Sequence, residues 1–508
     1  MFGRVDTSAV VGIEGQRVAV EADYGQGLPS FDMVGFLSSE VREARERVKS
    51  ALKNTGISVP PGRLTVNLSP ADLRKTGNSF DLPVAAAILI ALGILPQDLT
   101  EDYLFTGELA LDGSLRRING VLSHVILARS LGKKGVIVPA ENRREGLLVK
   151  GIGVYGFHCL QEVMHFLLGE EYKDDGAEET SLPENDERLP DFSEILGQES
   201  VKRAAAVASA GMHGLLMIGP PGSGKSLTAK RIPSILPPLT EEEQIECSRI
   251  HSVAGLLDPE KGLIRICPFR APHHTVSGSA LVGGGSIPRP GEMSLAHNGV
   301  LFLDEIAEFN KHTLDLMRQP LEDSRVVISR VYGSYVFPTR VMLVAAMNPC
   351  RCGYYPDRNR CKCSEAEVRQ YLSRLSRPLL DRIDIVTEVP RVDIRKLEQQ
   401  NSGQDSASIR REVIRAWEIQ KERYRGTGIH FNSQLSGRDI RKYCILGNEE
   451  RELLSEAFES LELSARAYDR ILKVARTAAD LSGSEQIGIR HIAEAVSYRA
   501  ADHKYFGG

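Results

Sequence analysis

The sequence predicts a multidomain α/β protein, in which a mixed α and β domain is followed by a parallel-sheet domain and then by a helical region. Three observations predict this order. An acidic stretch at residues 169–191 divides the chain, buried-strand patterns alternate with helix patterns between residues 197 and 347, and residues 408–505 show helix patterns only. Because strands that alternate with helices form parallel sheets, the middle part is expected to hold the parallel sheet.

Length and composition are those of an ordinary globular protein. The chain has 508 residues, which suits roughly three domains. Its 42% hydrophobic residues, 26% charged residues and net charge of −4 exclude disordered and collagen-like classes. The longest charge-free apolar run, residues 82–95, is shorter than the roughly 18 residues of a membrane span and is expected to be a buried helix. With no secretory signal visible, we expect a cytoplasmic protein without a membrane partner.

The acidic stretch is expected to be a flexible linker. It holds ten acidic and two basic side chains, and it has too little apolar surface to fold by itself. Before it, strand patterns lie at residues 17–22, 64–68 and 135–139, and helix patterns lie at residues 40–55 and 83–92. After it, we expect a helix at residues 197–210, strands at 214–219, 299–303 and 341–346, and a helix that begins at residue 225.

A glycine-rich loop joins the first of these later strands to a helix. It reads G-x-x-x-x-G-K-S and consists of Gly219, Pro220, Pro221, Gly222, Ser223, Gly224, Lys225 and Ser226. A strand before and a helix after such a loop are the setting of a phosphate-binding P-loop. The glycines let backbone N–H groups face the phosphates, Lys225 reaches the β and γ oxygens, and the Ser226 hydroxyl ligates Mg²⁺. The sequence therefore predicts an ATP and Mg²⁺ site.

Two further strands end in polar residues at the same sheet edge. Asp304 and Glu305 follow the strand at 299–303, and Asn348 follows the strand at 341–346. Asp304 suits the metal, and Glu305 is placed to act as general base on a water, which predicts ATP hydrolysis. Asn348 is suited to orient that water or to contact the γ-phosphate, although Asn-Pro also commonly ends a strand.

Together these residues resemble the AAA+ ATPases. The resemblance makes Arg382 an arginine finger that acts on ATP bound by the neighbouring subunit, which implies a ring; the alternative is a structural pair with Asp381 or Asp384. It makes residues 464–476 a lid helix with a sensing arginine, Arg466 as first choice and Arg470 as second. A charged helix face would also explain either arginine.

Further motifs narrow the resemblance. Phe269-Arg-Ala-Pro-His-His274, Gly283-Gly-Gly, Pro288-Arg-Pro-Gly-Glu-Met and the run 295–305 resemble the magnesium-chelatase-like ATPases of the ComM/YifB family. The resemblance runs essentially from end to end and implies a homo-hexamer linked to DNA branch migration in natural transformation, with single-stranded and branched DNA and recombination proteins as partners. It implies a Lon-protease-like α+β domain at residues 1–168, the linker at 169–191, an AAA+ core at 192–400 and a helical chelatase-type lid domain at 401–508.

A β-branched and aromatic stretch before the Asn348 strand predicts a hairpin around a Gly-Ser turn. In the related AAA+ proteins such a hairpin points into the ring pore. The candidate DNA contacts are Arg325, Arg330 and Arg340 for phosphates and Tyr332 and Tyr335 for stacking. A plain surface hairpin is the alternative.

The Lon-like part is expected to lack peptidase activity. Ser79 lies where Lon carries its nucleophile, but Leu122 matches the position of the Lon lysine, and a serine needs a base. His124 is near in sequence but points elsewhere on a helix. We expect a binding or ring-forming scaffold, whose Lys53, Arg74 and Lys75 contact DNA or are simply solvated.

Four of the eight cysteines form a C-x-C, eight-residue, C-x-C pattern: Cys350, Cys352, Cys361 and Cys363. Four thiolates can hold a structural Zn²⁺ in a tetrahedron, whereas free thiols or a disulfide-prone loop are the alternatives.

We therefore expect Mg²⁺-dependent ATP hydrolysis that drives DNA translocation and branch migration in recombination. One alternative is a chelatase-type motor that acts on a protein or metal-insertion partner. Another is a nucleotide-switched assembly platform, in which ATP closes a ring and hydrolysis only resets it.

Overall fold

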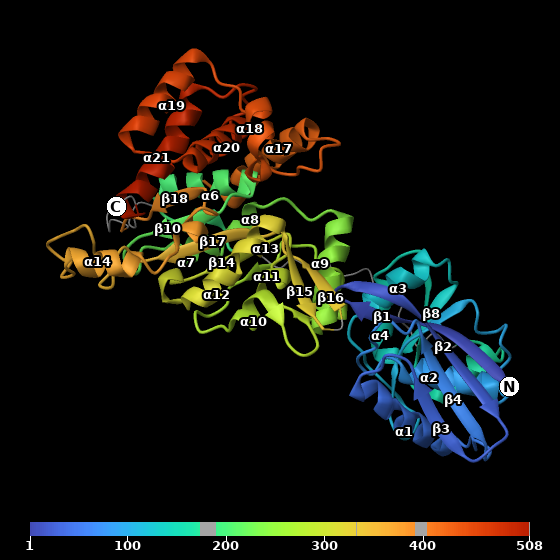
Figure 1. Cartoon of the computed structure of the whole chain (residues 1–508). Coiled ribbons are helices and arrows are strands. Elements are labelled where there is room, and N and C mark those ends of the chain that lie inside the picture. Colours follow the sequence, from blue (N-terminus) through green and yellow to red (C-terminus); the bar gives the residue numbers. More distant parts are fainter. Residues whose placement is uncertain (173–188, 332, 392–403, 507–508) are drawn as a thin grey trace.

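The computed structural model describes residues 1–172, 189–331, 333–391 and 404–506. They form two bodies that lie side by side (Figure 1), an N-terminal body of residues 1–172 and a C-terminal body of the remaining described residues. Most of the predicted linker lies outside the described residues. Among the helices described, none combines the length and the apolar character needed to cross a membrane.

The N-terminal body has a mixed seven-stranded sheet in the order β3-β4-β2-β1-β5-β8-β9. Its strands are β1 (Phe2–Val11), β2 (Glu14–Gly25), β3 (Ser30–Val34), β4 (Arg63–Ser69), β5 (Tyr103–Phe105), β8 (Gly135–Pro139) and β9 (Gly153–Phe157), and β6 (Glu108–Leu109) and β7 (Leu115–Arg116) pair apart from it. Its helices are α1 (Ser39–Asn54), α2 (Asp81–Ala91), α3 (Val121–Ser130), α4 (Ala140–Leu147) and α5 (Leu160–Leu167). Every residue of α2 is buried, which confirms the predicted buried helix.

The C-terminal body is built on a parallel sheet in the order β11-β14-β17-β10-β18. The strands are β11 (Phe269–Arg270), β14 (Val300–Leu303), β17 (Met342–Met347), β10 (Leu215–Ile218) and β18 (Ile385–Glu388). All residues of β10, β14 and β17 are buried, as expected for apolar strands covered on both faces. The predicted parallel sheet is confirmed.

Short helices and two antiparallel pairs surround this sheet. The helices are η1 (Phe192–Glu194), α6 (Glu199–Gly211), α7 (Lys225–Ala229), α8 (Ile232–Ile235), α9 (Glu241–Ala254), η2 (Pro259–Lys261), α10 (Gly278–Val282), α11 (Glu292–Leu295), η3 (Ile306–Glu308), α12 (Lys311–Leu316), α13 (Arg318–Asp323), α14 (Glu365–Leu372) and α15 (Arg377–Leu380). The pairs are β12 (Gly283–Gly284) with β13 (Arg289–Pro290) and β15 (Arg325–Arg330) with β16 (Gly333–Pro338).

The end of the chain is helical, as predicted: α17 (Ser406–Arg423), η4 (Asn432–Gln434), α18 (Gly437–Tyr443), α19 (Asn448–Ser460), α20 (Ala465–Leu481) and α21 (Ile489–Phe506). These helices share one apolar core with α6 and the parallel sheet. Trp417 Nε1 donates a hydrogen bond to the Ser209 carbonyl at 3.0 Å. Buried His213 contacts Asp384 and Thr477, each at 2.8 Å. The helical region therefore packs as part of the C-terminal body.

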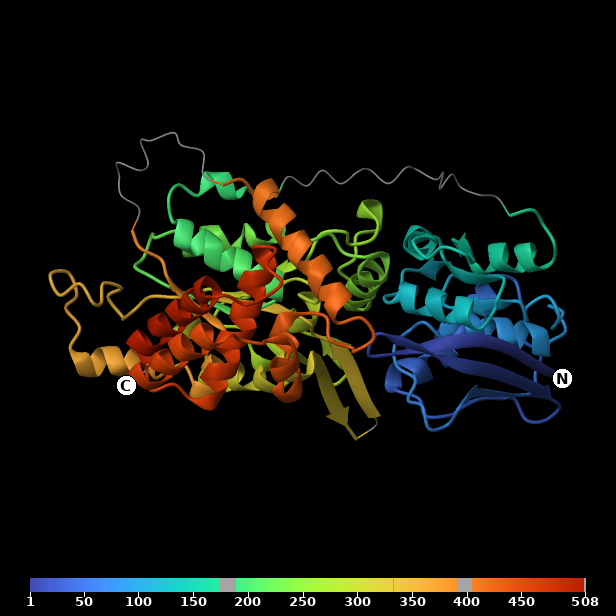
Figure 2. The same ribbon diagram turned by 90° about the horizontal axis from the view of Figure 1, so that it is seen from above.

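The two bodies meet where the turn between β1 and β2 reaches α9 and the β15–β16 hairpin (Figure 2). Ile13, in that turn, packs in an apolar cluster that includes Ile250 of α9 and Phe337 of β16. Arg249 donates a hydrogen bond to the Ile13 carbonyl at 2.8 Å, and Ser252 Oγ donates to Glu145 at 2.5 Å. The junction thus combines apolar packing with buried polar contacts.

Candidate active site

The polar ends of three parallel strands meet at one edge of the C-terminal sheet. β10 leads into the P-loop (residues 219–226), β14 leads into Asp304 and Glu305, and β17 leads into Asn348. Since parallel strands present their carboxyl ends at the same edge, the fold brings these groups together as the sequence predicted.

Backbone geometry explains the P-loop glycines. Gly222 and Gly224 have φ values of +74° and +94°, a region that favours glycine. A Cβ atom on Gly219 would lie 2.3 Å from the Val389 carbonyl oxygen. The loop therefore passes close to the chain after β18, where no side chain fits.

Lys225 is anchored at the sheet edge. Its Nζ donates hydrogen bonds to the carbonyl oxygens of Gly219 and Pro220, at 2.7 and 2.9 Å, and to Asn348 Oδ1 at 3.2 Å. Burial lowers the pKa of Lys225, and the nearby charges of Asp304 and Glu305 oppose that shift. The ammonium group and the Asn348 amide thus lie together.

Ser226 and Asp304 are in direct contact, because Ser226 Oγ donates a hydrogen bond to Asp304 Oδ2 at 2.6 Å. A hydroxyl and a carboxylate oxygen are the donors that Mg²⁺ prefers, so these residues fit the metal. Glu305 is exposed, and its φ of +49° is unusual for a residue with a side chain. Its N–H donates to Asp304 Oδ1 at 2.9 Å. This bent backbone turns Glu305 away from the strand direction, next to Asp304, whose carboxylate is the predicted Mg²⁺ ligand.

Sequence reasoning missed Gln198, which fastens the P-loop from the side. Gln198 lies just before α6, and its Nε2 donates to the carbonyl oxygens of Ser223 at 2.6 Å and Pro390 at 3.3 Å. It therefore links the P-loop to the segment after β18. The only local signal in the sequence is its position after Gly197 at the start of a helix. This position predicts a helix cap and gives no indication of a contact with the P-loop.

Two of the three candidate arginines contact Asp381, and the third, Arg382, is its neighbour in the chain. Arg382 pairs with Glu322 rather than with either of the aspartates considered as structural partners. Arg466 and Arg470 both contact Asp381, at 3.0 and 2.8 Å. The Arg466 side chain is 76% exposed, whereas that of Arg470 is 7% exposed and also donates to the Leu380 carbonyl at 3.2 Å. The two proposed sensing arginines therefore share one partner, Asp381, the residue that precedes Arg382.

The predicted hairpin is present, but its turn lies one step earlier than expected. Arg330 pairs with Gly333, so the Gly-Ser dipeptide belongs to β16 and the turn comes before Gly333. Tyr332 lies outside the described residues. Arg325 is exposed, as is Arg330, whose Nε donates to the Gly285 carbonyl at 3.3 Å.

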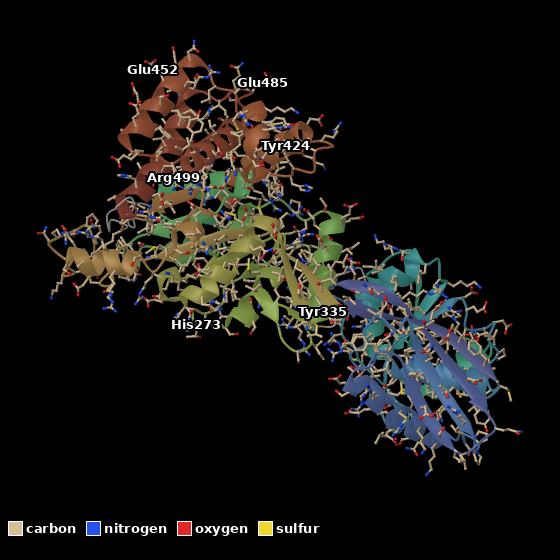
Figure 3. The ribbon with its side chains drawn as sticks, viewed as in Figure 1. His273, Tyr335, Tyr424, Glu452, Glu485 and Arg499 are labelled. Carbon is tan, nitrogen blue, oxygen red and sulfur yellow. The ribbon has the colours of Figure 1, made fainter. Side chains whose placement is uncertain are left out.

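Two of the candidate DNA contacts are corrected by their surroundings. Tyr335 is 8% exposed and packs in the apolar cluster of Ile13, at the junction of the two bodies (Figure 3), so its ring is not available for stacking. Arg340 lies beyond the hairpin. Its guanidinium donates to Asn298 and Glu243, both at 2.7 Å, which places it in a local polar network.

In the N-terminal body, the residues considered as bases for a peptidase site are buried, and His124 contacts another side chain. Leu122 is fully buried, and His124 is buried with its Nδ1 2.5 Å from Ser8 Oγ. Burial lowers the pKa of His124 to about 4. Lys75 is also fully buried and contacts the Pro70 carbonyl, so it is neither solvated nor exposed to DNA.

The four clustered cysteines converge in space. Their sulfur atoms all lie within 4.8 Å of one another, with Cys350 3.4 Å from Cys352 and 3.7 Å from Cys361, and with Cys352 3.6 Å from Cys361. Zn–S bonds of about 2.3 Å in a tetrahedron place sulfurs about 3.8 Å apart, whereas a disulfide requires about 2.05 Å. The cluster is therefore compatible with a structural Zn²⁺.

Family models cover most of the chain. One described as "Magnesium chelatase, subunit ChlI" matches residues 191–397, one described as "Subunit ChlI of Mg-chelatase" matches residues 20–142, and one described as "Magnesium chelatase, subunit ChlI C-terminal" matches residues 403–499. The three matches lie in the N-terminal body, in the sheet region with the P-loop and in the final helices.

Similar proteins extend over nearly the whole chain. The YifB protein of Salmonella typhimurium is 42% identical over 500 residues, which cover 98% of this chain and 97% of that protein. Competence protein ComM of Haemophilus influenzae is 42% identical over 502 residues, with the same two coverages. The magnesium-chelatase 38 kDa subunit of Chlorobaculum parvum is 27% identical over 257 residues, which cover 46% of this chain and 70% of that subunit. With its P-loop, its parallel sheet and this end-to-end similarity, the chain belongs to the ComM/YifB family of magnesium-chelatase-like AAA+ ATPases.

Proposed function

We propose that this protein hydrolyses ATP in a homo-hexameric ring in the cytoplasm and uses the energy to move along DNA, driving branch migration in recombination during natural transformation. The observation that carries the ATPase part is the convergence of the P-loop, Asp304 and Asn348 at one sheet edge, with the contacts Lys225–Asn348 and Ser226–Asp304. The DNA part draws on the hairpin and on the similarity to a competence protein.

The proposed chemistry assigns one role to each residue at the sheet edge. Lys225 binds the β and γ oxygens of ATP, while Ser226 and Asp304 hold Mg²⁺, which neutralises phosphate charge when bound. Glu305 accepts a proton from the attacking water while the oxygen of that water bonds to the γ-phosphorus. The bond from that phosphorus to the β,γ-bridging oxygen breaks, and ADP and phosphate leave. Asn348 orients the water.

The ring proposal assigns Arg382 to the nucleotide of a neighbouring subunit. Its partner Glu322 is 64% exposed, and exposed ion pairs contribute only about 0–1 kcal/mol to stability. Arg382 can therefore leave Glu322 for a phosphate at little cost. In the same proposal, Arg466 reports the bound nucleotide from a lid formed by the final helices.

The DNA contact is proposed for Arg325 and Arg330, the two exposed arginines of the hairpin. Arginines that neutralise phosphates bind without reading bases, as a motor that moves along DNA requires. The Lon-like N-terminal body is proposed to be a non-proteolytic scaffold that positions this hairpin, since the two are in contact at Ile13. Recombination proteins are the proposed partners.

A second function is favoured by the similarity to the magnesium-chelatase 38 kDa subunit. In this alternative, the same ATPase acts on a protein or metal-insertion partner, and DNA has no effect on hydrolysis. The P-loop chemistry is the same in both cases.

The test is ATP hydrolysis with single-stranded, forked and four-way DNA at two salt concentrations. We expect stimulation by DNA that weakens at higher salt, and no hydrolysis by Lys225→Ala. The variant Arg325→Ala/Arg330→Ala should keep basal hydrolysis, lose the stimulation and reduce the salt dependence of DNA binding by about two units of slope.

The matched control is Arg4→Ala/Arg63→Ala, which removes two exposed arginines from β1 and β4. It should behave like the unmodified protein. Hydrolysis that no DNA structure changes would contradict the DNA motor and favour the chelatase-type function.

Zn²⁺ is the cofactor proposed for the four-cysteine cluster, one ion per chain. The support is the spacing of the sulfur atoms together with the burial of Cys350 and Cys361. The cluster is separate from the residues proposed to hold Mg²⁺.

A further inference from the structure

We propose that the zinc-loaded cysteine loop, residues 350–363, braces the P-loop, so that occupancy of the metal site sets the affinity for ATP. This inference rests on the proposed Zn²⁺ site and on the proposed ATPase. It assigns to the metal a role in nucleotide binding in addition to the stability of its own loop.

The first observation is a backbone contact between the two loops. Gly353 has a φ of +84°, and a Cβ atom there would lie 2.5 Å from Pro221 Cδ in the P-loop. Gly353 therefore packs its backbone against the proline ring, in a space that admits no side chain. It follows Cys352 directly and its N–H donates to the Cys350 carbonyl at 3.0 Å, so two proposed metal ligands fix its position.

The second observation is the path from the cysteines to Lys225. Cys350 lies two residues after Asn348, which accepts the hydrogen bond from Lys225. The Tyr355 N–H donates to Cys350 Sγ at 3.4 Å, the kind of outer contact that orients a thiolate ligand. The metal cluster therefore holds both the residue that contacts Pro221 and the strand end that contacts Lys225.

The loop cannot hold this shape through regular structure. Between β17, which ends at Met347, and α14, which begins at Glu365, the described backbone forms turns and irregular segments. Four sulfur atoms without a cation offer only weak hydrogen bonds to one another, whereas a metal bound by all four fixes both C-x-C pairs at once. The contact with Pro221 is thus expected to depend on the ion.

The far side of the loop touches the chain beyond the sheet. The Tyr355 and Tyr505 rings lie 6.5 Å apart, and the Arg391 guanidinium lies 4.9 Å from the centre of the Tyr354 ring. Tyr505 belongs to α21, whose C-terminal end lies near α14 (Figure 1). The cysteine loop therefore spans the space between the P-loop and the last helix, which suits a brace.

The experiment separates the metal from the contact. Zinc content is measured by elemental analysis and ATP affinity by titration with a fluorescent ATP analogue, for the full chain and five variants. Cys361→Ser/Cys363→Ser removes two ligands, and Gly353→Ala places a methyl group against Pro221. Pro221→Ala and the combination Gly353→Ala/Pro221→Ala remove the ring atoms that the methyl group would meet. Gly426→Ala is the matched control, because Gly426 also has a positive φ, +76°, but faces open space.

We expect one zinc per chain in the unmodified protein and none in the double cysteine variant, with ATP bound about tenfold more weakly by that variant. Gly353→Ala should keep its zinc and also bind ATP about tenfold more weakly, which is the size of effect that overpacking gives. Adding Pro221→Ala to Gly353→Ala should restore part of the affinity, whereas Gly426→Ala should match the unmodified protein.

Three results would overturn the inference, and they differ from one another. A zinc-free double cysteine variant that is folded by circular dichroism and binds ATP normally refutes the brace and leaves the Zn²⁺ site standing. If that variant does not fold, normal ATP affinity in Gly353→Ala refutes the brace. No zinc in the unmodified protein, purified without chelators and supplied with Zn²⁺, refutes the metal site itself. The ATPase proposal is tested separately, by hydrolysis in each protein. If Lys225→Ala abolishes hydrolysis while the unmodified protein and the other variants retain it, the ATPase proposal survives each of these outcomes.

Discussion

Ser226 Oγ and Asp304 Oδ2 lie 2.6 Å apart, although the strands that position them, β10 and β14, are separated in the sheet by β17. The helix after the P-loop thus reaches across a strand to meet the carboxylate. This contact joins two residues that are 78 positions apart in the sequence, and it defines where a metal ion with oxygen ligands would bind.

Asp304→Asn should impair the use of Mg²⁺, because asparagine is neutral and offers only one oxygen to the ion. We expect about a hundredfold slower hydrolysis at low Mg²⁺ and partial recovery as Mg²⁺ is raised. The measurement is the hydrolysis rate against Mg²⁺ concentration. Asp323→Asn, at an exposed position on α13, is the control. Identical Mg²⁺ curves for Asp304→Asn and the unmodified protein would exclude Asp304 as a ligand.

Arg466 and Arg470 both pair with Asp381, but replacing them should change the free energy of unfolding by different amounts. Arg470→Ala leaves buried carbonyl oxygens unpaired and should reduce the free energy of unfolding by about 2 kcal/mol. Arg466→Ala, at an exposed position, should change it by less than about 1 kcal/mol. Denaturant unfolding measures both.

If Arg466 senses the nucleotide, Arg466→Ala should nonetheless lose hydrolysis under conditions in which it is fully folded. Normal hydrolysis by a folded Arg466→Ala variant would remove it as the sensing residue.

Acid should weaken the N-terminal body through His124. Its folded pKa of about 4 lies below the ordinary value of 6.5, so the unfolded state binds the proton more readily and stability falls as the pH drops from about 6.5 towards 4. A shift of this size corresponds to about 2 kcal/mol lost at pH 5 relative to pH 7.5.

The variant His124→Asn removes the titrating ring and should reduce this pH dependence, as measured by urea unfolding at both pH values. His165→Asn, at an exposed position, is the control for the loss of one histidine. Equal pH dependence in His124→Asn and the unmodified protein would show that another group is responsible.

Ile13→Glu should loosen the junction of the two bodies, because it places a charge in the apolar cluster that Ile13 forms with α9 and the β15–β16 hairpin. We expect a larger radius of gyration by small-angle X-ray scattering and faster proteolysis between the bodies. Ile13→Val keeps the apolar contact and should cost only about 1 kcal/mol. Unchanged scattering by Ile13→Glu would mean that the polar contacts at Ser252 and Arg249 suffice to hold the junction.

The sheet edge was predictable because its information is local. The P-loop has a fixed spacing, and the parallel-strand rule alone places Asp304 and Asn348 near it. The short apolar strands were predictable for the same reason, as was the buried helix within the apolar run 82–95, observed as α2 (Asp81–Ala91), since periodicity and composition suffice to find them.

Contacts between distant parts of the chain could not be predicted in this way. Tyr335 resembles a stacking residue until Ile13, more than 300 positions earlier, is seen to pack in the same cluster. Arg340 resembles a phosphate contact until Glu243 and Asn298 are placed beside it. Gln198 belongs to no recognisable motif, and its contact with the P-loop is seen only once the Ser223 carbonyl is placed beside it.

The single tryptophan of the chain gives the molecule a built-in optical reporter. Trp417 donates a hydrogen bond to the Ser209 carbonyl on α6, and the centre of its ring lies 4.6 Å from the centre of the Phe431 ring. Its emission therefore reports on the contact between the final helices and α6, inside the C-terminal body that carries the P-loop. A change in wavelength or quenching on adding ATP would record movement at that contact in the unlabelled protein, in real time.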